Sequence, residues 1–275
     1  MQNSELILCQ NTGNIFEKEA KPFVKWAGGK TQLLNELSDR LPLKIKMSKT
    51  VQRYVEPFVG GGAFFFFLKS NYEVKESFLY DINKELIIGY KVIQKDVQEL
   101  MYELERIEDE YINLPEIDRK EYYYKTRDEY NNQQDNFNYE TYNSDWIKRA
   151  AYLIFLNKTC FNGLFRQNKR GKFNVPFGRY KNPTICDKEN LLRVNEALKN
   201  TYVFSTDFEE SKKFIDANTL VYLDPPYRPL NKTSYFISYD KDGFTDDNFF
   251  ETFYAGYKIE RVLAKRSVNC DGTKR

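Results

Sequence analysis

The sequence contains no histidine among its 275 residues. This absence excludes imidazole-based catalytic triads, histidine general bases and histidine-ligated metal sites. Any chemistry must therefore use carboxylates, hydroxyls, lysines or an imported cofactor. The four cysteines lie far apart and form no C-x-x-C pair, which argues against a zinc site and is typical of reduced thiols in the cytosol.

Long apolar runs and an excess of one charge are also lacking. No apolar stretch approaches the length needed to cross a bilayer, and the first residues, MQNSELILCQ, have neither the basic segment nor the apolar core of a signal peptide. The 42 basic and 40 acidic residues nearly cancel, so a nucleic-acid surface must come from local arrangement. We expect a cytoplasmic protein that does not associate with membranes.

One glycine pair raises the question of a phosphate site. The stretch FVKWAGGKTQLL, residues 23–34, contains the GGKT that ends a P-loop. A P-loop also needs a glycine at the position that Val24 occupies and a strand before the loop. The preceding residues, NIFEKEAKP, are polar and broken by Pro22, which disfavours the P-loop interpretation.

Strand and helix patterns alternate along much of the chain. Apolar periodicity predicts strands over 53–58, 77–81, 201–205 and 218–224, and helices over 82–96 and 208–216. This alternation indicates an α/β domain with a mainly parallel sheet. A hydrophobic content of 41% is ample for its core.

The middle of the chain has another composition. From Val97 to Asn143, tyrosine, asparagine, glutamate and lysine replace most aliphatic residues, which indicates solvated helices inserted into the sheet domain. A further helix is predicted over 145–159 with Ser144 as its N-cap. It leads into CFNGLFRQNKRGKFNVPFGRYKNP, residues 160–183, a basic loop that by itself could be either a solvated surface or a DNA contact.

Candidate binding groups follow two of the predicted strands. Ligands of open α/β sheets bind beyond the carboxyl ends of the strands. The strand that ends at EPF is followed by Gly60-Gly61-Gly62, which forms either a tight turn or a close approach of the backbone to a ligand. Asp81 ends the next strand, where it either caps the following helix or accepts hydrogen bonds from a ribose. Together these residues predict a nucleoside site.

The last predicted strand ends in Asp224-Pro225-Pro226-Tyr227. The two prolines restrict the backbone, so the Asp224 carboxylate and the Pro225 carbonyl can point at one spot while Tyr227 offers an aromatic face. Two acceptors and a stacking plane suit a planar base that bears an amino group. The alternative is a strand that simply ends in a proline turn.

Five motifs in order, FVKWAGGK, EPFVGGG, YDIN, TDF and DPPY, resemble the Dam-type adenine-N6 DNA methyltransferases, the α group or D12 class. The resemblance spans about residues 22–244, and residues 162–183 resemble the target-recognition segment of that family. It implies a Rossmann-like methyltransferase core over 20–96 and 199–275 and an inserted, mainly helical target-recognition domain over 97–198. It further implies double-stranded DNA as substrate and a restriction-modification, phage or mismatch-marking context. We expect a monomer, paired with a cognate restriction endonuclease that shares its site.

The resemblance also implies residue roles. The cofactor S-adenosylmethionine would be bound by Trp26, Gly28, Gly29, Lys30, Phe58, Gly60, Asp81, Phe208 and Asp224. Asp81 would contact its ribose and Phe208 its adenine. Asp224 and the Pro225 carbonyl would accept hydrogen bonds from the target amine, with Pro226 holding the turn, and Tyr227 would stack on an adenine flipped out of the duplex. The DNA contacts would be Lys25, Arg166, Asn168, Pro176 and Arg179. The implied target is GATC, with Arg166 reading a guanine.

The chain departs from the family pattern after Asn248. There the family continues with a helix and a core strand, and relatives also extend past the position of Arg275. Losing a core strand would expose apolar surface and unpaired strand edges. Two alternatives therefore stay open: an inactive DNA-binding remnant, and a methyltransferase acting on a protein or RNA amino group. We also expect the loop 231–246 to close over the site when DNA binds.

Overall fold

A computed structural model of the chain describes residues 19–225. The remaining residues, 1–18 and 226–275, lie outside the described part. Several predictions therefore fall outside it: the roles of Pro226 and Tyr227, the closing loop 231–246, and the departure from the family pattern after Asn248.

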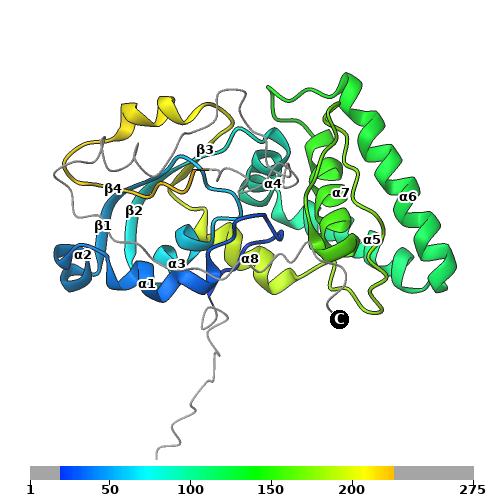
Figure 1. The fold of residues 1–275 in the computed structure, drawn as a ribbon, viewed down its shortest axis with the longest axis horizontal. Coiled ribbons are helices and arrows are strands. Elements are labelled where there is room, and N and C mark those ends of the chain that lie inside the picture. Colours follow the sequence, from blue (N-terminus) through cyan, green and yellow to red (C-terminus); the bar gives the residue numbers. More distant parts are fainter. Residues whose placement is uncertain (1–18, 226–275) are drawn as a thin grey trace, which may run out of the picture.

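A four-stranded parallel sheet forms one side of the molecule (Figure 1). Its strand order is β3-β2-β1-β4, and the strands are β1 (Thr50–Glu56), β2 (Glu73–Tyr80), β3 (Thr201–Phe204) and β4 (Thr219–Val221). At the centre of the register, Val55 of β1 pairs with Phe78 of β2 and with Val221 of β4. All four predicted strands are confirmed, as is the mixed α/β class with a parallel sheet.

Helices surround this sheet and extend away from it. They are α1 (Leu34–Asp39), α2 (Leu43–Ser48), α3 (Ala63–Asn71), α4 (Lys84–Lys95), α5 (Val97–Ile112), α6 (Glu116–Gln133), α7 (Asp145–Thr159) and α8 (Lys188–Ala197). Short 3-10 helices occur at η1 (Thr31–Leu33), η2 (Gln134–Asn136), η3 (Phe161–Gly163) and η4 (Phe208–Phe214). The predicted helix over 208–216 thus has the tighter 3-10 form. In the described part of the chain, no helix is both long and apolar enough to cross a membrane.

The two faces of the sheet are covered differently. Tyr54 and Leu79 face the main core, which α3, α4 and α8 complete. The other face holds a small cluster in which Val55 and Phe78 pack against Phe214 of η4. Figure 1 shows η4 on the side of the sheet opposite α3 and α8. Alternate residues of one strand therefore serve two cores, as the pleat requires.

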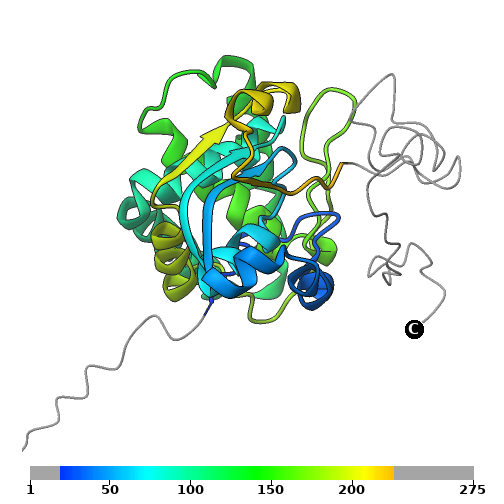
Figure 2. The same cartoon turned by 90° about the vertical axis from the view of Figure 1, so that its left-hand side faces the viewer.

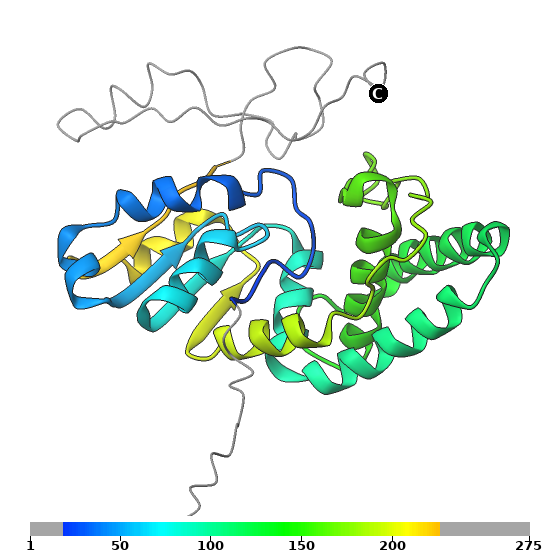
Figure 3. The same ribbon diagram turned by 90° about the horizontal axis from the view of Figure 1, so that it is seen from below.

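Helices α5, α6 and α7 form a second group beside the sheet (Figure 3). Helix α7 contacts α4, α5 and α6 and is buried along most of its length. The prediction of solvated helices over 97–143 is wrong for α5, which buries Val97, Leu100, Leu104, Ile107 and Tyr111 at helical spacing. The average composition of residues 97–143 is polar, and it concealed the apolar face of α5. Helix α6 is more polar and buries Tyr123, Thr126 and Tyr130.

The predicted N-cap position of α7 is confirmed, but the side-chain hydrogen bond at the helix start comes from the preceding residue. Ser144 occupies the cap position, but its side chain makes no capping hydrogen bond. Asn143 takes that role, because its Oδ1 accepts a 2.9 Å hydrogen bond from the Asp145 amide. Asparagine and serine both satisfy unpaired amides at helix starts, so sequence alone did not choose between neighbours.

Candidate functional site

The carboxyl ends of β1, β2 and β4 meet at one edge of the sheet (Figures 1 and 2). Since β2 and β4 lie on opposite sides of β1, strand order reverses between β1 and β4, the position where open α/β sheets bind ligands. Glu56 ends β1, Asp81 follows β2 and Asp224 follows β4. The predicted carboxylates Asp81 and Asp224 therefore lie at the same edge, close enough to Glu56 for their charges to act on it.

The glycine turn after β1 is held by Asp81. The Gly60 amide donates to Asp81 Oδ2 at 3.0 Å, and the Asn83 amide donates to Asp81 Oδ1 at 2.8 Å. Burial raises the pKa of Asp81, although these two backbone hydrogen bonds oppose the shift. The alternative role of Asp81 as helix cap belongs to Asn83, whose side chain accepts from the amides of Glu85 and Leu86.

The Gly28-Gly29 loop reaches the same place from the N-terminal side. Gly28 has φ +82°, and the Lys30 ammonium donates to its carbonyl at 2.8 Å. Lys30 Nζ also forms a 2.5 Å ion pair with Asp224 Oδ2, and both side chains are largely buried. Within residues 19–30 no strand precedes this loop, whereas a P-loop would need one.

Aromatic side chains line this region. The Trp26 ring stacks on Phe165 with centroids 4.7 Å apart, and a Cβ on Gly60 would meet Trp26 at 3.1 Å. The rings of Phe58 and Phe208 lie 5.4 Å apart. The residues that the sequence assigned to a cofactor thus lie around one edge of the sheet, and their individual roles stay predictions.

Glu56 is a member of this site that received no role from the sequence. It is 2% exposed, and Tyr54 donates a 2.8 Å hydrogen bond to its Oε2. Burial raises the pKa of Glu56 far above its ordinary value, and the negative charges of Asp224 and Asp81 add to the shift. The signal was available, since the acid directly follows the buried strand RYV.

The basic loop 160–183 contains a small hairpin. Gln167 and Phe173 form an antiparallel bridge, and the Asn168 amide donates to the Lys172 carbonyl at 2.9 Å. Asn168 Oδ1 accepts from the amides of Arg170 and Lys172, which closes the turn. The hairpin tip carries exposed Lys169 and Arg170.

The predicted DNA contacts are distributed around this hairpin. Arg166 is half-buried at its base, where its Nε donates to Asn174 Oδ1 at 2.8 Å. Pro176 and Arg179 are exposed farther along the loop, and Arg179 has φ +56°. Lys25 is exposed on the neighbouring glycine-loop segment. The structure places these residues on the basic loop and on the neighbouring glycine-loop segment, and it tests none of their roles.

Asn157 of α7 was missed by the sequence reasoning. Its Oδ1 accepts from the Lys25 amide at 2.8 Å, and its Nδ2 donates to the carbonyls of Lys25 at 2.9 Å and Gly163 at 3.0 Å. The side chain thereby joins the segment before the glycine loop to the start of the basic loop. A polar residue in the apolar run YLIFLN was the available signal.

Comparison with known proteins identifies the family. The model of the D12 class N6 adenine-specific DNA methyltransferases matches residues 26–268. The type II methyltransferase M.MjaIII of Methanocaldococcus jannaschii is 45% identical, over 94% of this chain and 96% of that protein. The type II methyltransferase M1.LlaDCHI of Lactococcus lactis subsp. cremoris is 37% identical, over 82% of this chain and 72% of that protein.

The DNA adenine methylase of Escherichia coli strain K12 is 35% identical, over 83% of this chain and 72% of that protein. These relatives are named as methyltransferases, and they give no support to the alternative of an inactive remnant. The family match, the parallel sheet and the acidic strand ends agree with the resemblance seen in the sequence. The chain belongs to the D12 class of N6 adenine-specific DNA methyltransferases.

Proposed function

We propose that this chain transfers a methyl group from S-adenosylmethionine to N6 of an adenine that it rotates out of duplex DNA, with GATC as the site. The observation that carries the proposal is the 2.5 Å ion pair between Lys30 and Asp224. It joins the FVKWAGGK loop to the strand that leads into DPPY, at the point where the strand order reverses. The family match supports the same reaction.

The residues around this point fit the cofactor. The amino acid part of S-adenosylmethionine carries an ammonium and a carboxylate, which complement Asp224 and Lys30. Asp81 lies beside the glycine turn, where a carboxylate suits ribose hydroxyls, and the Phe58 and Phe208 rings suit an adenine. When bound, the cofactor supplies a methyl group on a sulfonium, from which it leaves readily.

The protein's own task is alignment and charge stabilisation. Adenine N6 is a weak nucleophile because its lone pair is shared with the ring, and positive charge develops on it during transfer. Asp224 would accept an N6–H hydrogen bond, with the Pro225 carbonyl accepting the second. Lys30 holds the Asp224 side chain in place through their ion pair. Pro226 and Tyr227 keep their predicted roles of fixing the turn and stacking on the base.

The DNA would lie along the basic loop and Lys25. Exposed Lys169 and Arg170 at the hairpin tip suit phosphates, while Arg166, Asn168 and Pro176 are proposed to face bases, with Arg179 beside them. We assign residues 97–198 to target recognition and the flanking segments to the methyltransferase core. We further propose a cytoplasmic monomer, paired with a restriction endonuclease of the same site. The type II names of two relatives support this pairing.

The deciding experiment measures transfer of labelled methyl from S-adenosylmethionine to short duplexes. One contains GATC, others differ from it by one base pair, and one carries N6-methyladenine on both strands. We expect label on the unmodified GATC duplex alone. Label on every adenine-containing duplex would overturn the proposed site, and no label on any duplex from a folded preparation would overturn the proposed activity.

A pair of variants tests the placement of the site. Asp224→Ala should abolish transfer and leave the protein folded, because Asp224 lies after the strand and outside the core. Glu73→Ala is the matched control, since its carboxylate is 62% exposed at the opposite end of β2. Wild-type turnover by the Asp224 variant would refute its role.

A further inference from the structure

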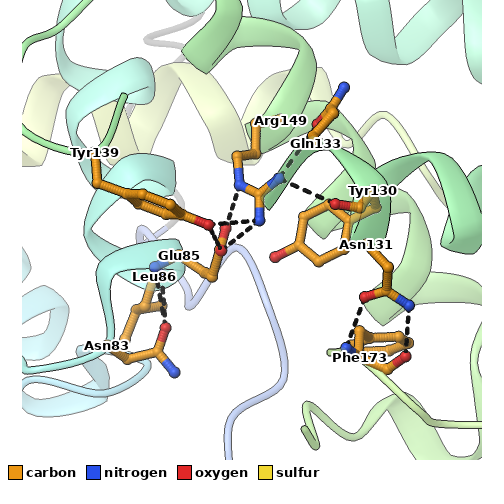
Figure 4. A network of polar contacts seen from close by, with 9 residues as sticks. All are labelled: Asn83, Glu85, Leu86, Tyr130, Asn131, Gln133, Tyr139, Arg149 and Phe173. Atoms are coloured by element: carbon orange, nitrogen blue, oxygen red, sulfur yellow. Dashed lines mark hydrogen bonds and ion pairs between the residues drawn. The ribbon is translucent and has the colours of Figure 1, made fainter. Parts of the chain in front are cut away.

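A buried ion pair joins helix α4 to helix α7 (Figure 4). Arg149 of α7 donates to Glu85 of α4 through Nε at 2.7 Å and through Nη2 at 2.5 Å. The two side chains are only 2% and 6% exposed. Such a two-point contact between a guanidinium and a carboxylate fixes direction as well as distance.

Arg149 makes further contacts with α6 and with the segment before α7. Its Nη1 donates to the Tyr130 carbonyl at 3.1 Å and to Gln133 Oε1 at 3.3 Å, and its Nη2 also donates to the Tyr139 hydroxyl at 2.8 Å. All five N–H groups therefore have acceptors. The guanidinium also lies over the Tyr130 ring at 4.3 Å and the Phe137 ring at 4.6 Å.

From Glu85, a continuous chain of hydrogen bonds leads to the cofactor side of the site. The Glu85 amide donates to Asn83 Oδ1 at 3.1 Å, and the Asn83 amide donates to Asp81 Oδ1 at 2.8 Å. Asp81 in turn accepts from the Gly60 amide at 3.0 Å. Glu85 thus stands in the first turn of the helix that begins directly behind the proposed ribose contact.

From Arg149, contacts lead to the basic loop. Tyr130 is followed by Asn131, whose side chain bonds both the amide and the carbonyl of Phe173, at 2.8 and 3.0 Å. Figure 4 shows this clamp beside the ion pair. Phe173 contacts Phe165 at 5.7 Å between ring centroids, and Phe165 stacks on Trp26, which packs against Gly60. The contacts therefore form a closed path that begins and ends at Gly60.

We propose that Glu85 and Arg149 form a positioning pair. The pair sets the basic hairpin at a fixed place relative to the glycine turn after β1, so that the DNA target is aligned with the methyl donor. This inference rests on the proposed function. A buried ion pair is weak evidence for stability, because apolar residues of similar volume stabilise as well or better. What the pair provides is a single relative orientation of α4 and α7.

The test compares three variants with the wild type. Arg149→Met leaves the Glu85 charge buried without its partner, so we expect a lower Tm. Glu85→Gln with Arg149→Met removes both charges and should recover most of that Tm. Arg149→Lys keeps the charge without the two-point geometry. For each, kcat/KM is measured on the target duplex and on duplexes changed by one base pair, together with the affinity for S-adenosylmethionine.

We expect the ratio of kcat/KM between target and altered duplexes to fall about tenfold or more in Arg149→Met, since small displacements of positioned groups have large effects. The ratio should stay low in the double variant although its Tm recovers, and Arg149→Lys should restore it in part. Arg53→Met is the matched control, because the Arg53–Glu76 ion pair joins two strands of the sheet. It should leave the ratio unchanged.

A ratio that recovers with the Tm in the double variant would overturn the positioning role and leave a structural one. A ratio unchanged in Arg149→Met would overturn it as well. The proposed function is tested separately, by transfer with the wild type alone. Absence of transfer by the wild type would contradict the proposed function, whereas unchanged discrimination in the Arg149 variants would contradict only the positioning role.

Discussion

Replacing Asn157 by alanine should disconnect the glycine loop from the basic loop. The side chain is 1% exposed and makes three hydrogen bonds, two with the Lys25 backbone and one with the Gly163 carbonyl. Alanine can make none of them. The Lys25 amide and two carbonyls would lose their partner in a site that excludes most water, so both stability and the placement of Lys25 should suffer.

The magnitude follows from the count of hydrogen bonds. At about 1 kcal/mol for each net hydrogen bond, the free energy of unfolding should fall by about 3 kcal/mol. Chemical denaturation measures this loss. Because Lys25 and the start of the basic loop are then free to shift, KM for target DNA should rise in the methyl-transfer assay, with a smaller effect on the affinity for S-adenosylmethionine.

The chain offers a matched control in Asn190 of α8. It is 6% exposed, and its side chain makes the same two bonds with the backbone of Lys21, both 2.9 Å long. Asn190→Ala should therefore lose about 2 kcal/mol by the same reasoning but leave KM for DNA unchanged. Equal changes of KM in the two variants would refute the reasoning, and so would an Asn157→Ala protein with wild-type KM.

Three further changes test other parts of the site. Burial stabilises the protonated form of Glu56 and raises its pKa, so the free energy of unfolding should decline as pH rises above about 4.3, the ordinary glutamate pKa. Glu56→Gln should flatten this decline, which denaturation curves measured at several pH values can show. Persistence of the full slope in the variant would rule out Glu56 as its source. Gly62→Ala should destabilise by more than the about 1–2 kcal/mol cost of a left-handed residue, since φ is +72° and the new Cβ would lie 2.5 Å from the Tyr90 hydroxyl oxygen. Adding Tyr90→Phe should recover less than the part due to the clash, because it also removes the 3.1 Å hydrogen bond from the Tyr90 hydroxyl to the Gly60 carbonyl. Arg166→Ala should relax discrimination at one guanine by about 1–3 kcal/mol in competition assays, and unchanged discrimination at every position would remove its assigned role.

The sheet could be predicted because each of its parts has a local signal. The strand at Ser77–Tyr80 is an apolar run that ends in an acid, and α4 shows helical spacing at Leu86, Ile87, Tyr90 and Ile93, all of which are buried. The local composition gave a wrong prediction for α5, in which only one face of the helix is apolar. Helix α5 buries six apolar residues at helical spacing within a polar stretch, and averaging over that stretch concealed them.

The location of the site could also be predicted from the sequence, because the carboxyl ends of parallel strands lie at the same edge of a sheet. Asp81 and Asp224 were expected there on that ground, and the structure places them at that edge. The residues that orient the site were not predicted. Glu56 acquires its raised pKa from burial and from neighbouring charges, which no local pattern contains.

Helix α7 shows why the sequence could indicate such residues without identifying their partners. In DWIKRAAYLIFLNKT, Arg149 and Asn157 interrupt an otherwise apolar surface, and buried polar groups in folded proteins nearly always have hydrogen-bond partners. The sequence therefore indicates that α7 meets polar groups at two points along its length. The partner of Arg149 lies 64 residues away on helix α4, and the partner of Asn157 lies 132 residues away on the segment before the glycine loop. Only the fold brings them together, at the contacts of α7 with α4 and with the segment before the glycine loop.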